Sequence, residues 1–190
     1  MTRVVDAGAK FAGWVGLGMA MVIVMAFALI IPVQAIVFVL APLAGVIIGV
    51  YANVRSERWR PRGKVLLNAA WAGLVTGLGI ALFYVVIRLV FIYGDSGALP
   101  DGTRINCQSG PECNYLRYVN AGQGADLAAV GIVDAATYEA AKWQELAVYG
   151  PGLVLLTLGG ALIGGAARTF SKMPTSLPLP SAQTNATPGD

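Results

Sequence analysis

The 190-residue chain is 56% hydrophobic and only 12% charged, with a mean hydropathy of +0.67. Soluble domains carry about 25% charged residues, so this composition excludes an ordinary soluble protein and favours an integral membrane protein. The net charge of +3 does not predict a nucleic-acid partner, because the basic residues flank apolar segments, where they act as a signal for membrane topology.

The first pair of predicted spans lies in residues 11–54, which contain no charged residue. This run is about twice the 20 residues that one span needs. The chain must therefore turn back, and residues 31–34, which contain Pro32 and Gln34, are the predicted hinge, because proline breaks a helix. The predicted spans are 11–31 and 34–53. A cleaved signal peptide is an alternative for the first span, but a secretory apolar core is usually shorter, about 7–15 residues.

The third and fourth spans are predicted at 66–92 and 149–167, which makes an all-α, four-helix transmembrane domain within residues 1–172. A more polar loop, 93–148, separates these two spans. The segment 173–190 is rich in proline, serine and threonine, and we expect it to be a disordered tail because it has little apolar surface to bury.

Orientation follows from the distribution of basic residues. The segments 1–10, 55–64 and 168–190 together hold nine Lys and Arg, whereas 93–146 holds three. Positive charge favours the cytoplasmic side, so both termini are expected in the cytoplasm and the loop outside, as in a plasma (inner) membrane protein. The segment 55–64 could also bind anionic lipid headgroups, although its topological role already explains its charge.

Small residues recur four positions apart in every predicted span, and this spacing places them on one helix face. Such faces let helices approach closely in lipid, either within one bundle or between subunits. The 73–77 stripe is the candidate for a subunit interface because it belongs to the longest stripe. The glycines expected in helix packing are Gly16, Gly45, Gly49, Gly73, Gly77, Gly160 and Gly164.

The stripes also resemble one another between the two halves of the chain. Residues 16–21 match 77–82, and 43–49 resemble 158–164. The pattern predicts a duplicated helical hairpin with the outer loop inserted in its second copy. Chance matches between apolar segments of low complexity are the alternative explanation.

Arg88 is the only charge inside a predicted span, and an arginine in hydrocarbon is by default a functional candidate. The alternative is that its side chain extends to the nearby membrane interface and is covered by Tyr84, one turn earlier. No Asp or Glu lies in a predicted span, which argues against proton- or cation-coupled transport. Thr76 and Thr157 are expected to bond carbonyls of their own helices.

The outer loop contains both cysteines, Cys107 and Cys113, separated by a segment with Gly110 and Pro111 that favours a turn. An oxidising compartment makes a local disulfide the expected state. Two thiols without any histidine in the chain cannot complete a tetrahedral metal shell, so we expect no metal and no cofactor.

Further along the loop, Asp134 is expected to cap a helix over 135–149 that lies on or near the membrane surface. Trp143 and Tyr149 would then sit at headgroup level. The sequence Gly-Pro-Gly at 150–152 predicts a bend into the last span.

These features predict a non-catalytic membrane protein that serves as an accessory, assembly or scaffold subunit through helix and outer-loop contacts. Its expected partners are the lipid bilayer and other membrane subunits or a second copy of itself. A small oligomeric transporter or channel component is the alternative. An enzyme is disfavoured, because the chain has no histidine and no nucleophile or metal motif.

Overall fold

The computed structural model describes residues 4–30, 33–54, 61–99, 102–108 and 110–170, and all of its named elements are helices. The predictions for the tail at 173–190 and for residues 55–60 of the basic segment lie outside the described residues.

Four of the helices are long and apolar enough to cross a membrane, which confirms the four apolar helices expected from the sequence. These four are α1 (Ala7–Val24), which runs on into the π-helical turn η1 (Met25–Ile30), α2 (Gln34–Val54), α3 (Arg62–Tyr93) and α6 (Ala135–Phe170). Three of them begin before the predicted spans: α1 and α3 by four residues each, and α6 by fourteen.

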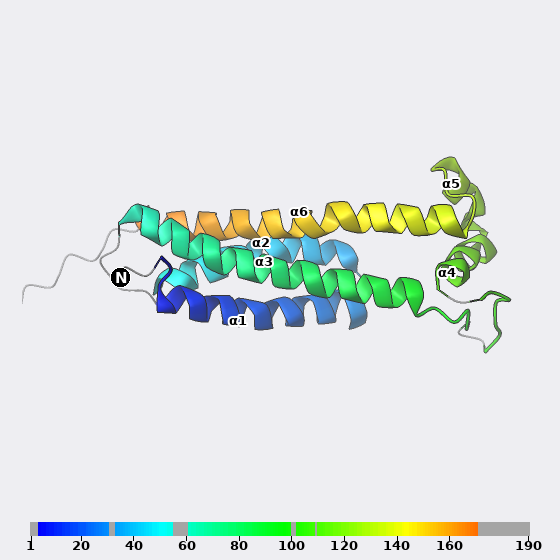
Figure 1. Cartoon of the computed structure of the whole chain (residues 1–190), viewed down its shortest axis with the longest axis horizontal. Helices are drawn as coiled ribbons and strands as arrows, with labels where there is room; N and C mark the ends of the chain where they lie inside the picture. The colour runs from blue at the N-terminus through cyan, green and yellow to red at the C-terminus, as the bar shows by residue number, and fades with distance from the viewer. Residues whose placement is uncertain (1–3, 31–32, 55–60, 100–101, 109, 171–190) are drawn as a thin grey trace, which may run out of the picture.

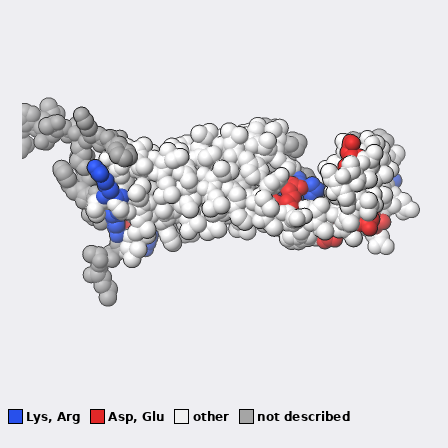
Figure 2. Space-filling view, turned by 90° about the horizontal axis from the view of Figure 1, so that it is seen from above, with Lys and Arg blue, Asp and Glu red and all other residues white. Residues whose placement is uncertain are grey.

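The four helices form an elongated bundle in which the chain runs up and down (Figure 1). The start of α1, the start of α3 and the end of α6 lie together at one end. We call this the basic end, because Lys10, Arg62, Lys64 and Arg168 are there. The segment between α3 and α6, residues 94–134, lies at the opposite end and is called the cap. Figure 2 shows a long stretch without charge between the two ends.

Glycine contacts hold α2 and α6 together. A Cβ atom at Gly45 would overlap the Thr157 carbonyl, and one at Gly160 would overlap the Pro42 carbonyl. Gly49 and Gly164 face Ala161 and Val46 in the same way. Because the backbones touch directly at this crossing, any side chain at these positions would force the helices apart.

The other glycine stripes also face helices of the same chain. A Cβ atom at Gly77 would lie 3.1 Å from the Cα atom of Val154, and one at Gly73 would overlap the Ala161 side chain. Gly16 of α1 faces Thr76 of α3. The 73–77 stripe is therefore covered by α6 and is not open to a second copy.

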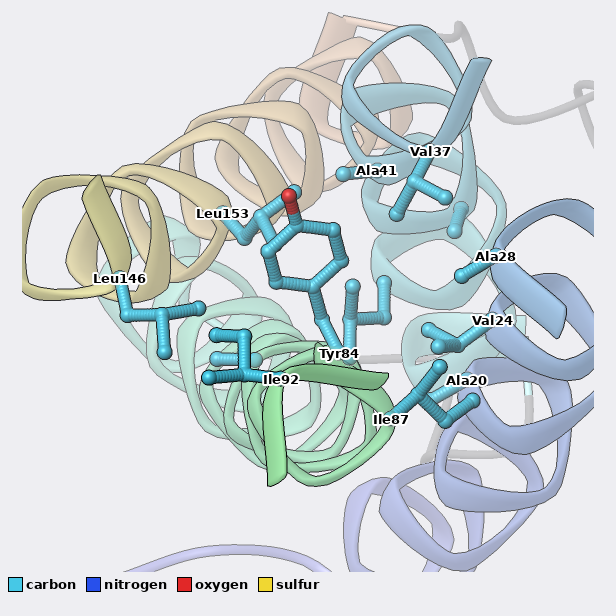
Figure 3. Close-up of a cluster of buried hydrophobic side chains, with 13 residues drawn as sticks. Ala20, Val24, Ala28, Val37, Ala41, Tyr84, Ile87, Ile92, Leu146 and Leu153 are labelled. Atoms are coloured by element: carbon cyan, nitrogen blue, oxygen red, sulfur yellow. The ribbon is translucent and has the colours of Figure 1, made fainter. Parts of the chain in front are cut away.

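Tyr84 is the largest fully buried side chain among the described residues, and it lies inside the bundle (Figure 3). It rises from α3 toward α2 and α6, and its ring meets Phe38 edge-on, with 5.9 Å between the ring centroids. Mostly aliphatic side chains surround it, so the bundle has an apolar core at this level.

The expected bend at residues 150–152 is wrong: α6 is one continuous helix of 36 residues with Pro151 inside it. A proline in a membrane helix removes only one backbone hydrogen bond and is tolerated where neighbouring groups support the helix. The first part of α6 therefore continues in line with the rest of the helix and lies beside the end of α3 (Figure 1). It does not form the separate helix on the membrane surface that was expected. Its predicted cap is confirmed, since the Thr137 backbone N–H donates to Asp134 Oδ1 at 2.8 Å.

Candidate functional site

Beyond the ends of α1 and α2, only α3 and α6 continue toward the cap (Figure 1). We call residues 88–93 and 135–148 the α3–α6 stalk. At a rise of about 1.5 Å per residue, the 32 residues of α3 span about 48 Å and the 36 of α6 about 54 Å. Both exceed the hydrocarbon thickness of about 30 Å, so the stalk carries the cap away from the apolar bundle.

Arg88 is held at the base of the stalk by an ion pair that the sequence did not predict. Its Nη2 atom donates to Glu145 Oε1 at 3.0 Å, and Lys142 Nζ donates to the other carboxylate oxygen at 2.7 Å. The side chains of Arg88 and Glu145 are only 14% and 20% exposed. Two cations thus share one carboxylate between α3 and α6.

Tyr84, expected to cover Arg88, points into the bundle core (Figure 3). Among the described residues, its hydroxyl has no hydrogen-bond partner, and neither has the buried Nε atom of Arg88. Thr76 and Thr157 behave as predicted, each donating its hydroxyl to the carbonyl four residues earlier at 2.8 Å. The Tyr84 hydroxyl is thus a buried polar group without a hydrogen bond to offset the loss of its contact with water.

The outer part of the stalk is joined by aromatic side chains. Trp143 Nε1 donates to the Tyr93 hydroxyl at 3.0 Å, and that hydroxyl donates to Glu139.

Tyr93 and Trp71 are both exposed on α3, and the 22 residues between them rise about 33 Å. Exposed aromatic residues favour the two interfaces of a bilayer, and this spacing matches its hydrocarbon thickness.

The cap begins with the cysteine pair. Cys107 and Cys113 lie at disulfide distance, with 5.3 Å between their Cα atoms, as their spacing predicted. Gly97 packs beside them with a φ of 72°, and a Cβ atom there would lie 2.7 Å from Cys107 Sγ. Glycine at this position therefore satisfies both the backbone conformation and the close approach.

Two side chains of α4 (Pro111–Tyr118) bond to the end of α3 and to the residues that directly follow it. Asn114 Nδ2 donates to the carbonyls of Phe91 and Ile92, each at 3.0 Å, which satisfies acceptors at the helix terminus. Arg117 pairs with Asp95 through two hydrogen bonds of 3.1 and 2.7 Å. These bonds from the guanidinium lower the pKa of Asp95 below its ordinary value.

One part of the cap, residues 119–133, is a mostly apolar segment that we call the cap knob. It contains the π-helical turn η2 (Val119–Gln123) and the short helix α5 (Gly124–Ala129). Val130 and Val133 are 72% and 61% exposed. The Tyr115 hydroxyl donates to the Val133 carbonyl at 2.7 Å, so this exposed surface is held in place.

At the basic end, Asp6 and Asn68 form a buried pair that the sequence reading missed. The Asp6 backbone N–H donates to Asn68 Oδ1 at 3.2 Å, and Asn68 Nδ2 donates to Asp6 Oδ2 at 2.8 Å. Lys64 Nζ donates to the Val4 carbonyl at 2.7 Å. A carboxylate just before a helix is a recognisable N-cap signal, but its partner on another helix depends on the packing.

The described residues contain no group of three or more His, Cys, Asp or Glu side chains arranged to hold a metal ion. Of the residues singled out in the sequence, the structure joins the two cysteines, places the glycines at helix crossings and gives Arg88 a carboxylate partner. Comparison with family models, curated proteins and solved structures found no match.

Proposed function

We propose that this chain is a non-catalytic membrane subunit that acts through contact, with the cap knob as its main contact surface. The observation that carries the proposal is the exposure of Val130 and Val133 on a cap that is hydrogen-bonded to α3 and packs against the Tyr138 ring of α6. Large apolar side chains that are exposed outside the membrane-spanning helices favour a protein contact at this place.

The interior of the bundle favours this function over transport. Its helices meet through glycine and alanine, and the described threonines inside it bond their own backbone. A transport pathway needs polar groups facing a shared interior, as in most intramembrane ion routes. The alternative, a transporter or channel component, requires the route to form between subunits.

We further propose that the cap lies outside the cytoplasm and that both termini face the cytoplasm of a plasma (inner) membrane. The nine-to-three distribution of basic residues supports this orientation. The cysteine pair supports it independently, because disulfides persist in oxidising compartments.

The test is the mass of the complex extracted from native membranes in mild detergent. We expect wild-type protein to migrate with a second polypeptide, and the double variant Val130→Asp, Val133→Asp to lose it. The matched control Asn106→Asp, Gln108→Glu adds the same charge to an exposed part of the cap outside the knob and should keep the complex.

Two results would reject the proposed contact. A wild-type protein that is monomeric after extraction has no stable partner, and loss of the complex in both variants would mean that the knob is not its site. A homo-oligomer that persists in the knob variant would instead favour the alternative of a pathway between subunits.

A further inference from the structure

Exposed cations from three helices lie together at the basic end. Lys10 belongs to α1, Arg62 to α3 and Arg168 to α6, and all three side chains are exposed. The packing of the helices brings them to one end: Gly165 faces Ala69 and Leu66, so the end of α6 runs beside the start of α3. Figure 2 shows basic side chains gathered at this end.

Acidic side chains do not cancel this charge within the described residues of the basic end. The one described carboxylate there, Asp6, is buried and hydrogen-bonded to Asn68. The acids of the outer loop lie at the other end of the molecule, beyond the uncharged middle (Figure 2). The surface of the basic end is therefore positive toward an approaching ligand.

The depth of these cations relative to the membrane identifies the ligand. Trp71 of α3 is exposed, as is Trp14 of α1, which follows Lys10 by one turn on the same face. Exposed tryptophans favour the boundary between hydrocarbon and headgroups. Lys10 precedes Trp14 by four residues, about 6 Å along the helix, which is within the headgroup region. Arg62 precedes Trp71 by nine residues, about 13 Å, so its long side chain must extend back along the helix to reach the headgroups.

We propose that Lys10, Arg62 and Arg168 form a binding site for the headgroup of an anionic phospholipid. The three cations come from separate helices, so a phosphate bound among them would bridge the ends of α1, α3 and α6. Each cation near a membrane surface strengthens binding to anionic lipid by about fivefold. This site is independent of the cap knob and goes beyond the proposed function.

The experiment reconstitutes the full chain in bilayers of phosphatidylcholine that contain spin-labelled lipid. Electron paramagnetic resonance then measures the relative association of labelled phosphatidylglycerol and labelled phosphatidylcholine with the protein. We expect the wild type to prefer phosphatidylglycerol, and the triple variant Lys10→Gln, Arg62→Gln, Arg168→Gln to lose most of that preference. A preference unchanged in the triple variant overturns the proposal.

Two further variants separate the site from general effects. The charge-preserving variant Lys10→Arg, Arg62→Lys, Arg168→Lys should keep the preference, which would show that positive charge at these three positions is what the lipid requires. Arg104→Gln removes an exposed cation from the cap and should also leave the preference unchanged. An equal loss in Arg104→Gln would mean that the net charge of the protein, and not this site, attracts the lipid.

Free anions are distinguished from lipid by competition. Inorganic phosphate should reduce the preference no more than chloride at the same ionic strength, because both then act only by screening. Stronger competition by inorganic phosphate would identify a site for a soluble anion and would overturn the assignment to a lipid headgroup.

Discussion

At the scale of single residues, the buried Tyr84 hydroxyl is the clearest energetic defect in the bundle. A buried polar group without a hydrogen bond costs about 1–3 kcal/mol. The ring itself fills the space between α2, α3 and α6 and meets Phe38 (Figure 3). The ring and the hydroxyl therefore have opposite effects on stability.

Replacing Tyr84 by phenylalanine is expected to raise stability by about 1 kcal/mol, because it removes the uncompensated hydroxyl and keeps the ring. The midpoint of thermal unfolding in detergent measures the effect. Tyr84→Leu serves as the contrasting variant and should lower the midpoint, since it removes ring contacts. A lower midpoint in Tyr84→Phe would show that the hydroxyl has a stabilising partner.

The shared carboxylate of Glu145 gives a second prediction at this scale. Glu145→Gln leaves Arg88 and Lys142 without their counter-ion in a site that is mostly buried. Removing one partner of a fully buried pair costs roughly 3–5 kcal/mol, and partial exposure reduces the expected loss here to about 2 kcal/mol.

The double variant Arg88→Met, Glu145→Met should recover most of that loss, because it removes both partners of the ion pair, and the long Lys142 side chain can then turn toward solvent. Thermal unfolding of Arg88→Met, of Glu145→Met and of the double variant measures the coupling between the two side chains. Asp126→Asn, at an exposed position of the cap knob, is the control and should change nothing. If the losses of the two single variants simply add in the double variant, the ion pair does not stabilise the stalk.

At the scale of the elements, adjacent glycines of α6 have different surroundings. A Cβ atom at Gly160 would overlap the Pro42 carbonyl of α2, whereas Gly159 has no heavy atom within 4 Å of the corresponding position. Sequence spacing identified the first as a packing residue, but it could not show that its neighbour faces open space.

Gly160→Ala is expected to destabilise the bundle by about 1–3 kcal/mol, because the added methyl group must push α2 away. Gly159→Ala should be neutral or stabilise by up to about 1 kcal/mol, since alanine favours a helix more than glycine does. Thermal unfolding in the same detergent compares them directly. Equal effects of the two substitutions would contradict the observed crossing of α2 and α6.

The elements also show where sequence reasoning stops. Uncharged runs and glycine spacing predicted four apolar helices, because both are properties of one segment. The Gly-Pro-Gly sequence at 150–152 led to the prediction of a bend, but α6 continues through it. Hydrogen bonds to Arg88 and Tyr93 hold the first part of α6 beside the end of α3, and these contacts between distant segments are not visible in the local sequence. Glu145 was missed as the partner of Arg88 for the same reason: the pairing depends on the antiparallel register of two distant helices.

At the scale of the whole molecule, the contacts of α2 with α6 agree with the predicted duplication, whereas the contacts of α1 and α3 do not. Gly45 faces Thr157, and its counterpart Gly160 faces Pro42, so α2 and α6 contact each other through equivalent positions. Gly16 faces α3, whereas its counterpart Gly77 faces α6. The duplicated hairpin therefore stays a prediction, supported at the α2–α6 crossing alone.

The separation of basic and acidic residues along the bundle leads to the last prediction, which concerns orientation. Asn120 is exposed in the cap knob, and Glu57 and Pro180 belong to segments on the cytoplasmic side of the proposed topology. A single cysteine at each position should react with a membrane-impermeant thiol reagent only at 120 in intact cells. After the cells are opened, 57 and 180 should react as well.

The native cysteine pair provides the background control for this experiment. Cys107 and Cys113 lie at disulfide distance, so the wild type should stay unlabelled until a reductant is added. Reaction at 57 in intact cells would reverse the proposed orientation, and the cap would then face the cytoplasm. In that case the thiols would be expected to be reduced and to react without added reductant once the cells are opened, because cytoplasmic disulfides are rarely maintained. Orientation and the redox state of the cap are thus tested together, and the proposed topology requires both results to agree.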